Sequence, residues 1–129
     1  AGKVYVSNGS NSGAWTARQD LITVHIRDIS TTVNIYVPII NAGTVTKLQS
    51  VTSDTISGSD LIITAYNSSS AFMGSLTIIQ AGSAAGDVDI SLPSSNNTVT
   101  AGSYIRINGN GGPSSHVDVM LLIAVDRTS

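Results

Sequence analysis

The stretch VDVMLLIAV, residues 117–125, is apolar at every position except Asp118. A run of this length made of Val, Leu, Ile and Met is typical of a β-strand whose two faces are both buried. It therefore predicts a central strand, covered on both faces by the core of the domain or lying in a subunit interface.

Shorter strand-forming segments precede this run, and residues that tolerate tight turns (Gly, Ser, Asn and Asp) stand between them. Turns that recur about every 8–15 residues are typical of sandwiches and jelly rolls. We therefore predict an all-β, single-domain β-sandwich, jelly-roll-like, over residues 21–129, with eight or nine short antiparallel strands. The choice between jelly-roll and immunoglobulin-like strand order stays open at this point. The segments are LITVHI (21–26), VNIYVPII (33–40), VTKLQSV (45–51), LIITAY (61–66), GSLTII (74–79), DVDISL (87–92) and TVTAGSYIRIN (98–108).

The first residues, AGKVYVSNGSNSGAWTARQD, are mostly polar and turn-forming. Their apolar exceptions include Tyr5 and Trp15, which is the only tryptophan of the chain. Residues 1–20 are therefore predicted to form an N-terminal arm or an irregular first strand, with Trp15 as its anchor.

Composition excludes several classes of protein. The chain has no cysteine, so it has no disulfide framework, thiol nucleophile or cysteine-based metal site. Its formal net charge is -2, and its six basic residues are scattered, which argues against nucleic-acid binding. No apolar run approaches the roughly 20 residues of a membrane helix, so no membrane partner is expected. Charged residues make up 11% of the chain, and the large uncharged β surface that this leaves favours assembly with other chains.

Asp87 and Asp89 are the candidates for a metal site, in the stretch GSAAGDVDISLP (82–93). We interpret the period-2 alternation as placing Val88 and Ile90 on one face of a strand and both carboxylates on its other, outward face. Two carboxylates without the spaced ligands of a calcium loop are weak evidence for a cation, and the glycines lack a phosphate-loop signature. We predict a tight turn between strands, with no metal and no cofactor.

The histidines offer the only hint of catalysis. Ser115, His116 and Asp118 imitate a catalytic triad in composition, but Ser115 and His116 would point to opposite faces of a strand, and no nucleophile elbow is present. The protein is therefore not expected to be an enzyme. His25 lies on the polar face of its segment and is a candidate for a subunit contact.

From residue 43 onward the chain carries an ordered series of motifs. In this series it resembles small β-rich structural proteins of tailed bacteriophages, of the capsid decoration (cement) or head-fibre type. This resemblance covers about residues 43–125 and implies a structural virion protein on the outer surface of the capsid, with the major capsid protein of the same virus as its partner. It implies no catalytic residues. The motifs are GTVTKLQSVTSDTISGSD (43–60), GSLTI (74–78), GSAAGDVD (82–89), NTVTAGSYI (97–105) and GGPSS (111–115).

Docking on a threefold axis of a shell would favour a homotrimer, whose subunits meet head to tail in a closed ring. The interface residues predicted for these contacts are Tyr5, Trp15, Arg18 and His25. The chief alternative is a carbohydrate- or receptor-binding β-sandwich module of a phage fibre or spike, with residues 67–70 and 108–115 as its loops. A hydrolase and a pilin-like or surface-layer subunit are weaker alternatives.

Overall fold

The computed structural model describes the backbone of residues 3–7 and 13–128 and the side chains of residues 18–128. Strands and connecting turns make up this part of the chain, and it contains no helix long and apolar enough to span a membrane. The all-β prediction is confirmed. The strands are β1 (Lys3–Ser7), β2 (Gly13–Ala17), β3 (Gln19–Ile26), β4 (Thr32–Pro38), β5 (Gly43–Thr52), β6 (Leu61–Tyr66), β7 (Phe72–Ile78), β8 (Val88–Ser91), β9 (Thr98–Val99), β10 (Tyr104–Asn110) and β11 (Val119–Arg127).

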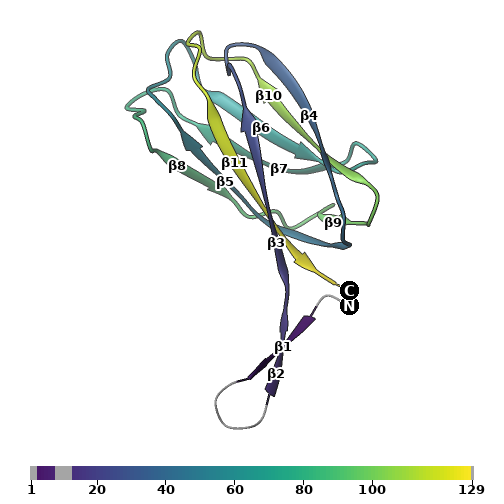
Figure 1. The fold of residues 1–129 in the computed structure, drawn as a ribbon. Coiled ribbons are helices and arrows are strands. Elements are labelled where there is room, and N and C mark those ends of the chain that lie inside the picture. Colours follow the sequence, from purple (N-terminus) through teal and green to yellow (C-terminus); the bar gives the residue numbers. More distant parts are fainter. Residues whose placement is uncertain (1–2, 8–12, 129) are drawn as a thin grey trace.

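Two antiparallel sheets form a sandwich (Figure 1). One has the order β4-β10-β6-β7, and the other has the order β3-β11-β5-β8, with β9 also pairing with β5. The pairing is nested: β3 pairs with the last strand β11, β4 with β10, β5 with β8 and β9, and β6 with β7. Nested pairing across two sheets is the jelly-roll arrangement, so the jelly-roll expectation is confirmed and the immunoglobulin-like order is excluded.

The apolar run at the C-terminal end forms β11, which lies between β3 and β5 as predicted. Val119, Leu121 and Ile123 point into the sandwich and are almost completely buried. The opposite side of the strand is different, because Met120 is 42% exposed there. Within the described residues the outer side of β11 is therefore covered only in part, since Ala124 is buried there while Leu122 and Met120 are not.

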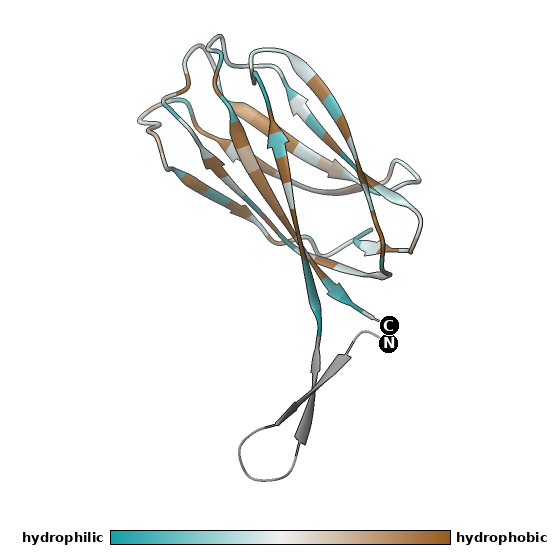
Figure 2. Ribbon diagram, in the orientation of Figure 1, coloured by the Kyte–Doolittle hydropathy of each residue, from teal (hydrophilic) through white to brown (hydrophobic). Residues whose placement is uncertain are grey.

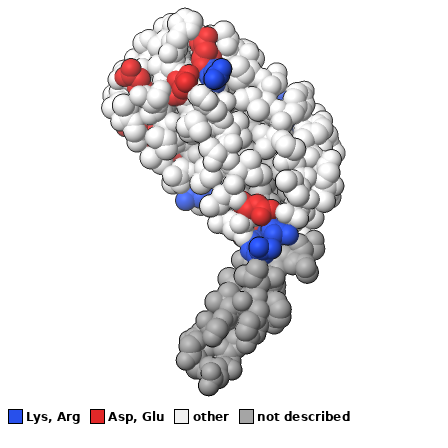
Figure 3. All heavy atoms as spheres, viewed as in Figure 1, with Lys and Arg blue, Asp and Glu red and all other residues white. Residues whose placement is uncertain are grey.

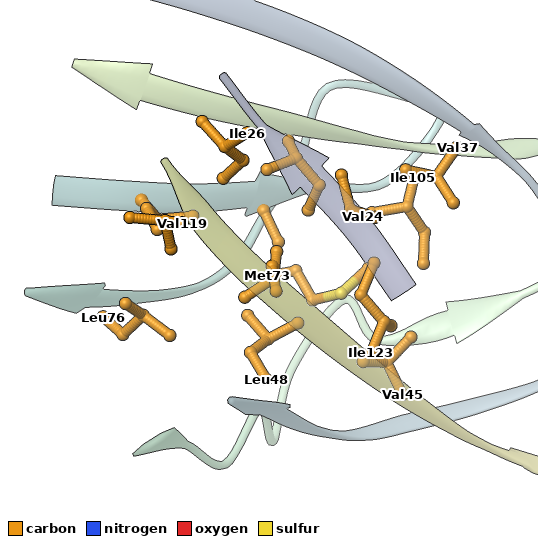
Figure 4. Packing of buried hydrophobic residues seen from close by; sticks show 14 of the residues in the cluster. Val24, Ile26, Val37, Val45, Leu48, Met73, Leu76, Ile105, Val119 and Ile123 are labelled. Carbon is orange, nitrogen blue, oxygen red and sulfur yellow. The ribbon is translucent and has the colours of Figure 1, made fainter. Parts of the chain in front are cut away.

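The core fills the space between the two sheets, and Figure 4 shows aliphatic side chains from both of them meeting there. Val24, Leu48 and Ile123 come from the β3-β11-β5-β8 sheet, and Val37 and Ile105 come from the β4-β10-β6-β7 sheet. Interdigitated aliphatic side chains of this kind supply the main favourable term in folding.

The face assignment predicted for β8 is wrong. Val88 and Ile90 are 51% and 52% exposed, whereas Asp89 is partly buried and lies opposite the fully buried Ser50 of β5. Burial raises the pKa of Asp89, and the nearby Asp87 carboxylate raises it further. The alternation had the right period, but a period-2 pattern does not say which of its two faces points inward.

The stretch before β8 is a pair of tight turns, as predicted. Gly82 and Gly86 both have positive φ angles, of 77° and 87°, which residues with a Cβ rarely adopt. The N–H of Gly86 donates to the carbonyl of Thr52, 2.8 Å away, and the N–H of Ala84 donates to the Asp87 carboxylate at 2.8 Å. The Asp87 carboxylate therefore closes the turn.

Replacing Ser50 by alanine is expected to raise the free energy of unfolding by about 1 kcal/mol, because the side-chain hydroxyl is buried with no hydrogen-bond partner among the described residues. Urea unfolding of the two proteins measures the difference. A clear loss of stability in Ser50→Ala would show that the hydroxyl is hydrogen-bonded after all.

Residues within the predicted arm form a β-hairpin. β1 pairs antiparallel with β2 in a sheet of their own, with Tyr5 directly opposite Trp15 in the register. Only Arg18 separates β2 from β3, and in Figure 1 the hairpin extends away from the end of the sandwich.

Candidate binding surfaces

The outer face of the β3-β11-β5-β8 sheet carries aliphatic side chains where a solvated face would carry polar ones. We call it the aliphatic face. Three rows of paired residues cross it, and their one formally charged side chain is Lys47. Exposed apolar members occur on all four strands, namely Leu21, Met120, Val51, Val88 and Ile90, and the two exposed polar members, Thr23 and His25, lie on β3. In Figure 2 hydrophobic and hydrophilic residues alternate along these strands. The rows are His25–Met120–Val51–Val88, Thr23–Leu122–Gln49–Ile90 and Leu21–Ala124–Lys47, with the exposed Leu92 just beyond β8.

Most of the surface visible in Figure 3 is uncharged, and the charged groups gather mainly toward the two ends of the sandwich. Contiguous apolar surface without charge is uncommon on a monomeric protein and marks a site of interaction with another macromolecule. The aliphatic face can therefore bind a partner by removing apolar surface from water.

The outer face of the β4-β10-β6-β7 sheet has a different chemistry. The four described aromatic residues gather on it in two edge-to-face pairs, Tyr36 with Tyr104 at 5.2 Å between ring centroids and Tyr66 with Phe72 at 6.5 Å. We call this the aromatic face. The Arg106 guanidinium lies 4.1 Å from the centre of the Tyr66 ring, a cation–π contact.

Amide side chains complete the aromatic face. Arg106 donates to the Asn34 side-chain oxygen at 3.0 Å, and the Asn108 amide donates to the same oxygen at 3.1 Å. These bonds hold the guanidinium in place over the Tyr66 ring. The face thus combines ring surfaces with fixed hydrogen-bonding groups.

Two histidine–aspartate pairs lie at one end of the sandwich. His25 Nε2 is 2.9 Å from Asp118 Oδ2, and His116 Nδ1 is 3.0 Å from Asp28 Oδ1. The hydrogen bond with His25 lowers the pKa of Asp118, and the backbone N–H of Asp28 adds to this effect. The pKa of Asp28 is lowered mainly by the hydroxyl of Ser30, which donates to it, with a smaller effect from His116.

The residues that imitated a triad have other partners. Asp118 is paired with His25 and His116 with Asp28, while Ser115 Oγ accepts a hydrogen bond from the backbone N–H of Ser57 at 3.1 Å. Each of the three therefore has a contact that holds the loops at this end of the sandwich.

Replacing Asp118 by asparagine is expected to lower the melting temperature by a few degrees at most at pH 7 and to have no effect at strongly acidic pH. Because the pKa of Asp118 in the folded state lies below its ordinary value of 3.8, the carboxylate stabilises the fold above that value. This contribution is lost as the pH falls through the lowered pKa. Thermal melts of both proteins over a pH series test this, and a difference that persists at about pH 2 would contradict it.

The four predicted interface residues do not form one site. His25 lies at the edge of the aliphatic face, and Arg18 is exposed beside the hairpin, with its carbonyl accepting a hydrogen bond from the N–H of Arg127. The side chains of Tyr5 and Trp15 lie outside the described residues. Sequence reasoning missed both sheet faces, although apolar residues at consecutive positions of β11 were a signal for the aliphatic one.

No family model matches the chain, and no curated protein is similar to it in sequence. A solved structure with a similar fold is a chain of the acidic stable capsid structure of Helicobacter pylori bacteriophage KHP30. The two chains superpose with a TM-score of 0.54 and are 11% identical, and the match covers 86% of this chain and 89% of the other. At this level of identity the two chains share a fold.

Proposed function

We propose that this protein is a structural virion protein of a tailed bacteriophage. Its role would be that of a capsid decoration (cement) protein, which binds the outer surface of the assembled head and has the major capsid protein as its partner. The observation that carries the proposal is the jelly-roll match over nearly the whole length of both chains to a phage capsid structure. The phage-like motifs of residues 43–115 point in the same direction.

The aliphatic face is the surface that we assign to the shell. It is broad and has almost no charge, so burying it against another apolar surface would release water without leaving an ionic group unpaired. A protein that works through this contact requires no catalytic residue and no cofactor. This supports a structural role over an enzymatic one.

Stabilisation of the head would follow from selective binding. A protein that binds only the assembled lattice stabilises that state by mass action, by about 2.7 kcal/mol per site when its concentration is a hundred times its dissociation constant. Repeated over the many equivalent sites of a shell, contacts of modest affinity would resist bursting.

Cosedimentation with capsids that lack the protein tests this function. We expect saturable binding to mature shells, no binding to unassembled shell protein, and a higher temperature of capsid disruption when the sites are occupied. Absence of binding to every shell of the parent phage would contradict the proposal.

A second candidate function, glycan recognition by a fibre or spike module, is favoured by the aromatic face. The apolar C–H face of a pyranose ring packs against exposed aromatic rings, and its hydroxyl groups pair with groups such as Arg106 and the Asn108 amide. A glycan array run with the wild type and with Tyr36→Ala separates the two functions. Reproducible binding that is lost in the variant would favour the glycan module, and its absence would leave the decoration role.

A further inference from the structure

One side of the sandwich is open. Among the described strands, β3 pairs only with β11 and β4 pairs only with β10, so each has an unpaired edge on the same side of the molecule. Between these edges runs a groove made of two hollows, which share Ile22 and Pro38. The core-facing side chains Ile22 and Ile35 are only partly buried there. We call this the open groove.

The opposite side of the sandwich, between β7 and β8, is covered in part, and a hollow lined by Ile78, Val88 and Asp89 lies at one end of it. A Cβ on Gly74 of β7 would lie 3.3 Å from the ring of Pro93 and 3.4 Å from the Ser91 hydroxyl, so the backbone of β7 packs closely against the chain around β8. The open groove differs from this side because its two hollows follow the edges of both sheets, along residues 19–25 and 35–41. Apolar side chains and two rows of unpaired backbone groups meet in it, which is a combination that accepts an added β-strand.

The β1–β2 hairpin supplies strands that have no place in either sheet of their own sandwich. A two-stranded hairpin alone is marginally stable in water, so it gains stability by packing on another surface. Its strands are five residues long, or about 16 Å at 3.3 Å per residue. β3 has eight residues, which is about 26 Å on the same scale, so a hairpin strand fits along its edge.

The hairpin cannot reach the groove of its own chain. Arg18 is the single residue between β2 and β3, and its carbonyl is held by the N–H of Arg127 at 2.8 Å. A reversal of chain direction needs a turn with at least two central residues, and one bound residue does not provide it. The hairpin therefore continues outward from β3, as in Figure 1, and the groove that it can fill belongs to another copy.

We propose that the β1–β2 hairpin of one copy docks in the open groove of the next copy, adding a strand along its β3 or β4 edge. The contact joins two different surfaces, so it is head to tail, and it closes into a ring when the rotation between copies permits. A homotrimer is the ring that we expect. The proposal concerns contacts between copies and does not require that the shell be the ligand.

Cysteine cross-linking tests this contact directly, because the natural chain has no cysteine. One full-length protein carries Ala14→Cys in β2, and the other carries Ile40→Cys, at a groove residue that is 82% exposed. When the two are coexpressed and mildly oxidised, we expect a disulfide-linked heterodimer. The matched control replaces Ile40→Cys by Thr77→Cys, on the exposed side of β7, and we expect no cross-link there.

Light scattering supplies the second measurement. We expect a trimer for the wild type and at least tenfold weaker association for Ile40→Asp, whose exposed position allows folding that circular dichroism can verify. The proposal is overturned if the wild type stays monomeric. It is also overturned if the wild type is a trimer that Ile40→Asp leaves intact and no cross-link forms between β2 and the groove. A trimer that binds no shell would overturn the decoration function and leave this contact standing, whereas a monomer that saturates shells would do the reverse.

Discussion

Replacing Leu121 by alanine is expected to lower the free energy of unfolding by about 2–5 kcal/mol. Leu121 is the third residue of β11, is completely buried, and is paired with Val24 on one side and Ser50 on the other. Truncation loses the transfer free energy of the side chain and leaves a cavity that the paired strands cannot collapse into. Since a domain of this size is stable by only about 5–15 kcal/mol, the variant would be close to unfolding.

Denaturant unfolding followed by circular dichroism measures this loss, and Met120→Ala is the matched control. Met120 is the adjacent residue of the same strand but points to the aliphatic face, where it is 42% exposed. We expect the control to lose about 1 kcal/mol or less. Equal losses in the two variants would mean that the aliphatic face is as well covered in the isolated chain as the core is.

Replacing Ile90 by lysine is expected to weaken binding to the capsid at least a hundredfold without loss of folding stability. Ile90 is 52% exposed on β8, at the edge of the aliphatic face. In the free protein a lysine there keeps its ammonium group in water. In the bound state the group would be buried against an apolar surface without a partner, and burying an unpaired charge costs several kcal/mol. A hundredfold loss of affinity corresponds to about 2.7 kcal/mol.

Cosedimentation titrations measure the dissociation constants, and Ile62→Lys is the control. It makes the same chemical change at a site of similar exposure, 40%, on β6 in the other sheet. We expect its affinity to match the wild type. If Ile62→Lys abolished binding and Ile90→Lys did not, the shell would contact the sheet that carries the aromatic face, and the assignment of the aliphatic face would be wrong.

The sequence predicted the two sheet faces only in part, because it shows the alternation of side chains along a strand but not which side of the strand faces the core. β8 shows this most clearly, because its alternation of Val88, Asp89 and Ile90 is plain in the sequence and yet the inward face was misassigned. The usual rule places apolar residues inside, but β8 is an edge strand whose apolar side faces away from the core. The aromatic face could not be predicted from the sequence either. Its four aromatic residues are spread over positions 36 to 104 and come together only through the pairing of β4, β10, β6 and β7.

By itself, the sequence determined the properties that depend on neighbouring residues. β-Branched residues and turn-forming residues defined an all-β chain and most of its strands, and the run 117–125 identified the central strand, because backbone preference and alternation are local. Only the tertiary structure decided the nested order of strands, the sheet faces that stay uncovered and the open groove between β3 and β4. Those features depend on which distant segments pair, and the free energy that selects the pairing comes from burying apolar surface of the whole chain at once.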